Sequence, residues 1–441
     1  MLYRKIKDKI TEYLKSGTDK VLIVEGARQI GKTFIIRVAG RELFDNFIEL
    51  NLLRDYEGEK LFEKVRTTED FYFQLSMLAG DKMKERDNTL IFLDEIQAYP
   101  HLLTMLKFLR EDNRYTYICS GSLLGITLSQ SSSIPMGSID IMQMYPLDFE
   151  EFLLSQGFNS YSIDSIRNKF EAKESLDENT HNKLLNLFKK YLLIGGLPEA
   201  INVYNADNNI VNVRRIQNEI HEFYKADASK YDDEHKLKIR RIYDEIPSYM
   251  QNKKKRIVIK NIENKGWKRS SDYADEFDYL INAGIALEVK AISNPVFPLI
   301  ESSGKNLLKL YLNDAGILSG ILYRNNVRAV MDDLNSVNLG SLYETAVATE
   351  LKAHGYNLYY YDNRSKGEVD FLIDDYDNLC SLPIEVKSGK DYIEHSALNN
   401  FLNNPDYNVK RAFVFSNERE VKIKNSITYL PVYYIMFFNQ E

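Results

Sequence analysis

Eight residues near the N-terminus carry the clearest chemical pattern in the chain. Residues 26–33 read Gly-Ala-Arg-Gln-Ile-Gly-Lys-Thr, which is the spacing G-x-x-x-x-G-K-T. Glycines let backbone N–H groups turn around a phosphate, and the N-terminus of a following helix adds a favourable dipole. Lys32 would bridge the β- and γ-phosphates, and Thr33 would bind Mg²⁺. The pattern predicts a nucleotide site made by Gly26, Ala27, Arg28, Gln29, Ile30, Gly31, Lys32, Thr33 and Phe34.

Two acidic residues follow an apolar run later in the chain. Residues 90–95 read Leu-Ile-Phe-Leu-Asp-Glu, so a buried strand would end in Asp94 and Glu95. Asp94 would hold Mg²⁺ through water, and Glu95 would polarise the attacking water as a general base. Such a strand end could by itself be a helix cap, but its pairing with the phosphate motif favours hydrolysis of a nucleoside triphosphate.

Two serines end another strand candidate, at 114–122. Ser120 or Ser122 could contact the γ-phosphate next to Glu95, and a plain strand-ending turn is the alternative. No Lys or Arg occurs between Arg114 and Arg167. A ring of subunits in which an arginine from this region triggers hydrolysis in the neighbouring subunit is therefore disfavoured.

The elements that must position these residues alternate between strands and helices. Continuous apolar strands predict a parallel sheet covered on both faces, and right-handed crossovers then give a three-layer α/β sandwich. From about 148 the pattern turns helical, and 271–284 with the strand after it resembles a winged helix-turn-helix. A helix at 341–355 and three strands then predict an α+β domain. The sandwich strands are predicted at 21–26, 47–52, 89–95, 114–122 and 138–147.

A second acidic pattern lies near the C-terminal end. Asp370 precedes Glu385-Val386-Lys387 with the spacing D-x(14)-E-x-K, which is similar to the core of PD-(D/E)xK nucleases. Residues i and i+2 of a strand share a face, so Glu385 and Lys387 would point the same way. With Glu344 on the preceding helix, the acids could hold a second Mg²⁺ or Mn²⁺, and Lys387 could activate water. The alternative is an inherited fold whose charges no longer cleave anything.

Charge and composition limit the partners. The 441 residues carry a formal net charge of −7, which excludes a simple basic nucleic-acid coat. Lys253, Lys254, Lys255 and Arg256 form the strongest local basic stretch. Contact with the DNA phosphate backbone is one interpretation, and a solvated surface is the other. Two distant cysteines and the lack of a long apolar run or signal peptide predict a cytoplasmic protein without a membrane segment.

Nearly the whole chain resembles a prokaryotic family of AAA-type ATPases with a C-terminal domain of unknown function that has a restriction-endonuclease-like fold. The resemblance implies a P-loop ATPase domain at 1–195, a helical and winged-helix-like domain at 196–335 and a nuclease-like domain at 336–441. Many members have Gly-Arg where this chain has Gly137-Ser138. The motifs that carry the resemblance are GARQIGKT, IFLDEIQ, SGSLLG, MYPLDFEEFL, GGLPEAI, KLYLNDAGIL, LGSLYETAVATEL, GEVDFL and IEVKSG.

These observations lead to one functional hypothesis and one alternative. The chain would bind and hydrolyse ATP with Mg²⁺, and its nucleotide state would gate a nuclease-like, DNA-interacting domain. The alternative is a signalling or binding ATPase whose inactive nuclease-like fold recognises nucleic acid or protein. A protein partner and a second copy of the chain both stay open.

Overall fold

The computed structural model divides the chain into two compact units. The first unit comprises residues 3–145 with 282–284, and the second comprises 1–2, 146–281 and 285–441. The sequence-based boundaries at 195/196 and 335/336 remain predictions. The structure describes residues 1–122, 137–228, 236–252, 255–257, 262, 270–302, 308–334, 337–363, 366–389, 393 and 395–439.

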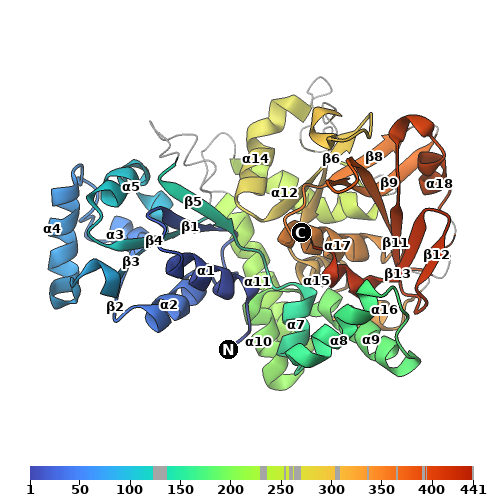
Figure 1. Ribbon diagram of the computed structural model, residues 1–441, viewed down its shortest axis with the longest axis horizontal. Coiled ribbons are helices and arrows are strands. Elements are labelled where there is room, and N and C mark those ends of the chain that lie inside the picture. The colour runs from blue at the N-terminus through green and yellow to red at the C-terminus, as the bar shows by residue number, and fades with distance from the viewer. Residues whose placement is uncertain are drawn as a thin grey trace. The chain divides into compact units, whose positions relative to one another are not determined.

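A five-stranded parallel sheet forms the centre of the first unit (Figure 1). Its strand order is β2-β3-β4-β1-β5, so β1 lies between β4 and β5 and the phosphate motif follows an inner strand. This sheet confirms the α/β class expected from the alternating strands and helices. The strands are β1 (Val21–Glu25), β2 (Asn46–Asn51), β3 (Thr89–Asp94), β4 (Thr116–Gly121) and β5 (Ile139–Gln143).

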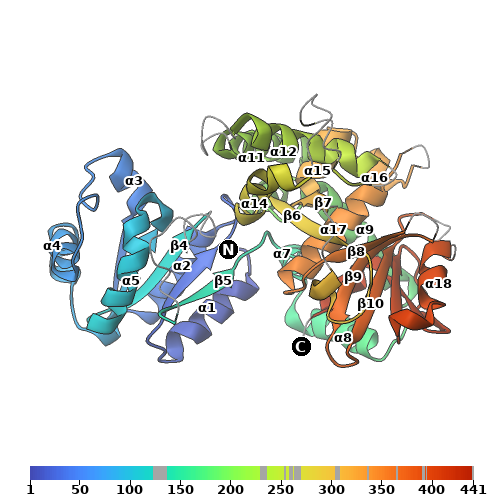
Figure 2. The same cartoon turned by 90° about the horizontal axis from the view of Figure 1, so that it is seen from above.

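Helices cover both faces of this sheet (Figure 2). Every residue of β1 and β3 is buried, which is why both strands read as continuous apolar runs. Ile23 and Ile91 face one core together with Leu75 and Leu103 of the helices α4 and α5. The helices of this unit are α1 (Lys5–Lys15), α2 (Lys32–Leu43), α3 (Leu52–Glu57), α4 (Thr68–Ala79) and α5 (Pro100–Asp112).

The second unit contains a helical region and an eight-stranded mixed sheet. Its sheet order is β12-β13-β11-β10-β9-β8-β6-β7. The strand proposed as the wing of a winged helix is β6, and it pairs in parallel with β8. Strands from both sides of 335/336 therefore share one sheet. The strands are β6 (Ala286–Ile292), β7 (Leu308–Leu312), β8 (Tyr359–Asn363), β9 (Gly367–Asp375), β10 (Cys380–Val386), β11 (Ala412–Ser416), β12 (Lys422–Lys424) and β13 (Ile427–Pro431).

The helices of the second unit follow the predicted helical segments. One core of the sheet packs Leu398 and Phe401 of α18 against strand residues such as Val369 and Val414. The helix α17, predicted at 341–355, contacts the sheet through β10, β6 and β7. The helices are α7 (Phe149–Ser155), α8 (Ser160–Glu171), α9 (Glu178–Ile194), α10 (Pro198–Asp207), α11 (Ile210–Ala228), α12 (Lys236–Gln251), α14 (Ala274–Asn282), α15 (Ala315–Tyr323), α16 (Arg328–Met331), α17 (Gly340–Ala353) and α18 (Ser396–Leu402).

Several sequence motifs without evident chemistry meet at one junction in the second unit. The Gly196 N–H donates to the Asp314 carboxylate at 2.6 Å, and the Leu147 N–H donates to the Gly196 carbonyl at 2.7 Å. Asp314 also caps α15 by accepting from the Ile317 N–H at 2.9 Å. A Cβ at Gly196 would lie 2.2 Å from the Leu147 carbonyl oxygen, so this approach requires glycine. The motifs MYPLDFEEFL, GGLPEAI and KLYLNDAGIL thus form one packing junction.

We predict that Asp314→Ala destabilises the second unit. The change leaves two buried N–H groups without acceptors, at about 1–3 kcal/mol each, so the free energy of unfolding should fall by roughly 2–6 kcal/mol. Urea denaturation followed by circular dichroism measures it. Asp332→Ala, which removes an exposed carboxylate, is the control and should change stability by less than about 0.5 kcal/mol. Equal stability of both variants would contradict the junction.

Candidate functional site

The phosphate motif forms the turn between β1 and α2 in the first unit. Gly31 has φ +94°, a left-handed conformation that glycine adopts without strain, and it directly precedes the first residue of α2. Arg4 supports the turn, because its guanidinium donates to the Ile30 carbonyl at 3.0 Å and to the Tyr145 carbonyl at 2.6 Å. Sequence reasoning missed this arginine. Phe34, expected to contact nucleotide, is half-exposed on α2.

Lys32 lies buried inside the turn. Its ammonium donates to the carbonyl oxygens of Gly26 and Ala27, each at 2.8 Å. Burial lowers the pKa of Lys32 to about 8, although the nearby Glu95 and Asp94 oppose this change. The ammonium is thus placed on the loop that would surround the β- and γ-phosphates.

Asp94 is the centre of the predicted magnesium site. Its buried carboxylate accepts hydrogen bonds from the Thr33 hydroxyl at 3.1 Å, the Asn51 amide at 3.0 Å and the Ser120 hydroxyl. Burial raises the pKa of Asp94, and the Ser120 hydrogen bond opposes this change. A carboxylate beside a hydroxyl supplies hard oxygen ligands, so Thr33 and Asp94 fit Mg²⁺. The structure brings together the residues predicted for this ion, and Asn51 is an addition.

Glu95 lies one residue beyond β3, beside a polar network. Its backbone is left-handed, with φ +57°, which is unusual for a residue other than glycine. The carboxylate accepts from the Gln97 amide and lies 3.9 Å from the Arg28 guanidinium. The Ser122 hydroxyl accepts from Arg28 at 3.2 Å and from Gln97 at 3.3 Å. The predicted base and the predicted γ-phosphate contact are therefore joined, and Gln97 is the member that sequence reasoning missed.

The C-terminal acids lie together in the second unit. Ile384 pairs with Phe371 across β9 and β10, so Asp370 and Glu385 are neighbours on adjacent strands. Asp370 accepts from the Val386 N–H at 2.9 Å, and Lys387 donates to Glu385 at 2.8 Å. Burial, with the negative charges of Glu385 and Glu344, raises the pKa of Asp370. The predicted quartet is thus brought to one place, with Glu344 supplied by α17.

Lysines neutralise much of this acid cluster. The Lys255 ammonium pairs with Glu344, which also accepts from the Tyr311 hydroxyl at 3.0 Å. Lys309 pairs with Glu368 on β9. One buried oxygen of Glu385, Oε2, has no hydrogen-bond partner among the described residues. Within that same set, no group of three or more His, Cys, Asp and Glu side chains is arranged to hold a metal ion.

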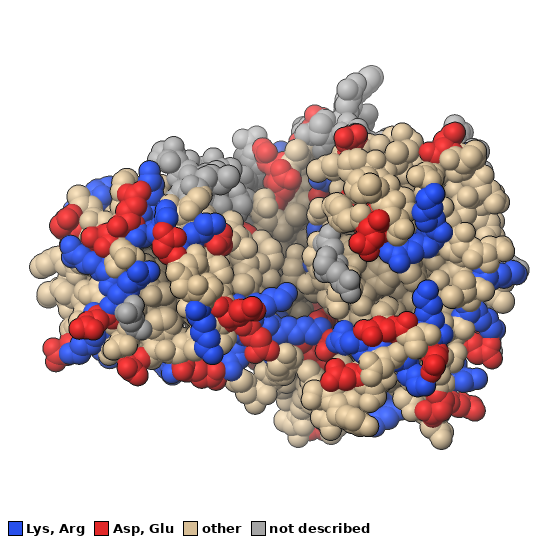
Figure 3. Space-filling view, in the orientation of Figure 1, with Lys and Arg blue, Asp and Glu red and all other residues tan. Residues whose placement is uncertain are grey.

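The predicted phosphate-contacting stretch has a different environment from the one expected. Lys255 pairs with Glu344 and is largely buried, and Arg256 pairs with Asp362 at 3.1 Å. These two cations are therefore already engaged by carboxylates. Lys253 and Lys254 lie outside the described residues. On the face that Figure 3 shows, Lys and Arg are interspersed with Asp and Glu.

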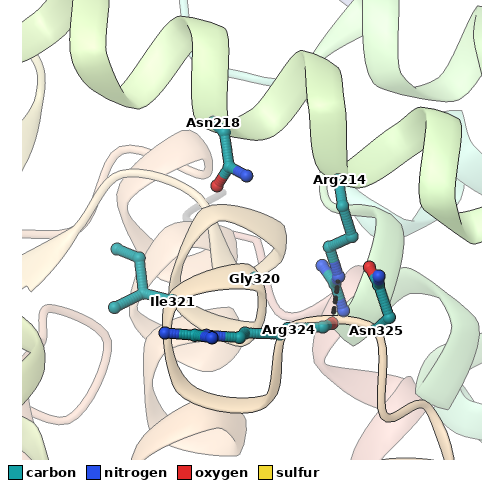
Figure 4. Close-up of a pocket in the computed structure, with 6 residues that line it drawn as sticks. All are labelled: Arg214, Asn218, Gly320, Ile321, Arg324 and Asn325. Carbon is teal, nitrogen blue, oxygen red and sulfur yellow. Dashed lines mark hydrogen bonds between the residues drawn. The ribbon is translucent and has the colours of Figure 1, made fainter.

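A separate pocket of roughly 430 Å³ lies between α11 and α15 (Figure 4). The buried Arg214 guanidinium donates to the carbonyl oxygens of Arg324 at 2.7 Å and Leu193 at 2.9 Å, so it caps the ends of α15 and α9. Figure 4 shows that the Arg324 side chain extends toward Ile321 and away from Arg214. Because the two guanidiniums do not converge, we interpret Arg214 as a packing residue.

Comparison with known proteins indicates a nucleotide-binding domain in the same part of the chain as the phosphate-binding turn. Residues 18–153 match the AAA domain family, and residues 185–327 and 339–435 match two domains of unknown function, DUF8612 and DUF4143. The uncharacterized protein MJ1637 of Methanocaldococcus jannaschii is 24% identical over 417 residues, covering 88% of this chain and 80% of that protein.

Two solved structures are similar at low identity. The Walker-type ATPase PABY2304 of Pyrococcus abyssi is 12% identical, with a TM-score of 0.44, covering 72% of this chain and 95% of that one. The Hsp104–ADP complex of S. cerevisiae is also 12% identical, with a TM-score of 0.30, covering 64% of this chain and 37% of that one.

The family match and the phosphate-binding turn define the class of the first unit. It is an AAA-type P-loop ATPase domain, which binds ATP and ordinarily uses Mg²⁺. None of the described helices combines the length and apolarity that a membrane span requires.

We predict that Glu95→Gln separates binding from turnover. The amide keeps the size of the side chain but cannot accept a proton, so ATP hydrolysis should fall by about 10²–10⁴-fold while ATP still binds. Lys32→Ala should instead weaken ATP binding itself. Phosphate release and calorimetric titration measure the two effects. Glu63→Gln, on an exposed residue of the same unit, is the control. Full turnover by Glu95→Gln would contradict the assigned base.

Proposed function

We propose that the chain is an ATP-hydrolysing switch whose nucleotide state controls a C-terminal nuclease-like, DNA-interacting domain. The observation that supports hydrolysis most directly is the set of donors around Asp94. Thr33, Asn51 and Ser120 come from three different elements and converge on one carboxylate. Glu95 adjoins this group, where a water could be aligned against the γ-phosphate.

The roles within the site follow from charge and position. Lys32 would neutralise the β- and γ-phosphates, and Thr33 with Asp94 would hold Mg²⁺. Glu95 would take the proton of the attacking water. Ser120 or Ser122 would contact the γ-phosphate. Ser120 lies near the end of β4, Ser122 directly follows this strand, and both lie close to the acids. ATP binding and hydrolysis would then change the protein between two states.

The acid cluster of the C-terminal domain is proposed to hold the divalent cation of a DNA-cleaving site. Asp370 and Glu385 offer oxygen ligands of the kind that Mg²⁺ or Mn²⁺ takes, and Glu385 Oε2 is a buried acceptor that a cation would satisfy. Lys387 lies beside Glu385, where it could stabilise a pentavalent phosphate. A cytoplasmic location stays a prediction, compatible with Cys119 and Cys380 as buried free thiols.

We predict Mg²⁺- or Mn²⁺-dependent cleavage of supercoiled plasmid or single-stranded DNA that changes when ATP is added. Asp370→Ala should abolish it by removing a cation ligand, and Lys387→Ala should lower it by about 10²-fold or more. Lys32→Ala should remove the ATP effect while leaving the acid cluster intact. Gel electrophoresis of the DNA measures the outcome, and Asp374→Ala on the same strand is the control. Cleavage that survives Asp370→Ala would assign it to a contaminant.

A second candidate is a signalling ATPase whose nuclease-like domain binds nucleic acid or protein without cutting. The ion pair between Lys255 and Glu344 supports this candidate. The Lys255 ammonium already neutralises Glu344, the acid that would complete the metal site. It would stand in for the divalent cation that cleavage requires.

The two candidates differ in their predicted affinity for Mn²⁺. If Lys255 occupies the cation position, Lys255→Met should tighten Mn²⁺ binding by at least about tenfold, since it removes a positive charge in contact with Glu344. Titration followed by electron paramagnetic resonance measures free Mn²⁺. Lys410→Met, at an exposed lysine, should leave the affinity unchanged. Tight binding by the wild-type chain, unaltered in Lys255→Met, would remove the support for the second candidate.

A further inference from the structure

We propose that Arg28 is the catalytic arginine of this ATPase and that it acts within its own chain. The inference rests on the proposed hydrolysis of ATP and names the group that stabilises charge on the γ-phosphate. No Lys or Arg lies between Arg114 and Arg167, so this segment supplies no catalytic cation. A transferred phosphoryl group nonetheless develops charge on its oxygens, which a guanidinium stabilises strongly.

Arg28 belongs to the phosphate-binding turn itself. Its Nε donates to the Ser122 hydroxyl at 3.2 Å, and its Nη2 lies 3.9 Å from Glu95 Oε2. Only 16% of its side chain is exposed, so the guanidinium is held inside the site rather than in solvent. The turn therefore places this cation beside both the predicted base and the predicted γ-phosphate contact.

The contacts of Arg28 place its guanidinium beside Ser122 and Glu95, the residues predicted to contact the γ-phosphate and the attacking water. Lys32 donates to the carbonyl oxygens of the turn, whereas Arg28 of the same turn contacts Ser122 and lies near Glu95. The turn thus supplies two cations, and the consecutive residues Asp94 and Glu95 at the end of β3 supply two carboxylates. Lys32 reaches the loop carbonyls and Arg28 reaches Glu95, so a γ-phosphate lying between loop and base would meet both cations.

The contact with Glu95 also gives Arg28 a role before ATP binds. A guanidinium nitrogen of Arg28 lies 3.9 Å from a carboxylate oxygen of Glu95, so the cation is already next to the predicted base. The γ-phosphate of ATP carries more negative charge than Glu95 and offers a guanidinium several oxygens. Arg28 would move from Glu95 to these oxygens, which frees the carboxylate when substrate is present.

The chemical step then uses groups of one chain. The oxygen of water forms a bond to the γ-phosphorus, and the bond from that phosphorus to the β–γ bridging oxygen breaks. The electron pair of the broken bond leaves with ADP, and the proton of the water passes to Glu95. Arg28 would donate N–H groups to the γ-phosphoryl oxygens as their charge changes, and Lys32 would neutralise charge on the departing ADP, with Thr33 and Asp94 as the residues that would hold Mg²⁺ for the same purpose.

Replacement of Arg28 tests the inference. Arg28→Ala should lower kcat by about 10²–10³-fold while ADP affinity stays within about threefold. Arg28→Lys should not restore turnover, since an ammonium lacks the planar fork that contacts two oxygens. Added guanidinium at millimolar concentration should partly rescue Arg28→Ala but not Arg28→Lys. Arg54→Ala, an exposed arginine of the same unit, is the matched control and should behave as wild type.

A second readout separates catalysis from support of the turn. The wild-type chain with ADP and aluminium fluoride should form a long-lived complex that retains a fluorescent ADP, and Arg28→Ala should not. A merely structural arginine would instead weaken ADP binding and thermal stability. Turnover per chain should also be independent of protein concentration, because the guanidinium is supplied in cis.

The outcomes distinguish this inference from the proposed function. If the wild-type chain hydrolyses ATP and Arg28→Ala keeps its kcat within threefold, the inference is wrong and the ATPase assignment stands. If turnover per chain falls on dilution, a partner copy supplies the group and the inference is again wrong. If the wild-type chain itself shows no turnover with Mg²⁺ and ATP, the proposed hydrolysis fails and the inference fails with it.

Discussion

The buried carboxylate of Asp94 is the constraint on which the first unit depends. An ionised acid inside a protein is costly unless hydrogen bonds compensate it, and Asp94 obtains them from Thr33, Asn51 and Ser120. These donors come from α2, from β2 and from β4. The strand order β2-β3-β4-β1-β5 places β3 between the two strands that contribute. The strand order that builds the sheet therefore also supplies hydrogen bonds that the buried Asp94 carboxylate requires.

The second unit answers the same requirement with lysines and backbone groups. The Asp314 side chain is buried, and the N–H groups of Gly196 and Ile317 compensate its charge. Glu344 and Glu385 are instead paired with Lys255 and Lys387. The backbone N–H groups around Asp314 are fixed by the fold, so that arrangement is suited to packing. The second uses side chains that a cation or a phosphate could displace, so it is suited to binding.

The ATP site combines both kinds of compensation. Asp94 is held by neutral donors, whereas Glu95 contacts the Gln97 amide and lies near the Arg28 guanidinium. A carboxylate that lies near a guanidinium can be released when the guanidinium turns toward a more anionic ligand. In the proposed mechanism, substrate binding would free Glu95 through movement of the Arg28 side chain. The chemistry depends on charges that lie within one turn and two strand ends.

The amino-acid sequence by itself determined the class of the first unit and the identity of its main groups. Apolar runs such as 21–25 and 89–94 reflect burial on both faces, which local composition records directly. The phosphate motif and the acid pair at the end of β3 are each contiguous in the sequence, so spacing alone predicts Lys32, Thr33, Asp94 and Glu95 as site residues. The D-x(14)-E-x-K spacing likewise placed Asp370 and Glu385 on neighbouring strands, because a short turn joins those strands.

Only the tertiary structure decided which distant residues complete these sites. Asn51 reaches Asp94 because β2 pairs with β3, and Lys255 reaches Glu344 although the two residues are 89 positions apart in the chain. Long-range strand pairing also joined β6 to β8, where local pattern had indicated the wing of a separate domain. Local periodicity reports whether a residue is buried, but the partner that compensates its charge is chosen by how the whole chain packs.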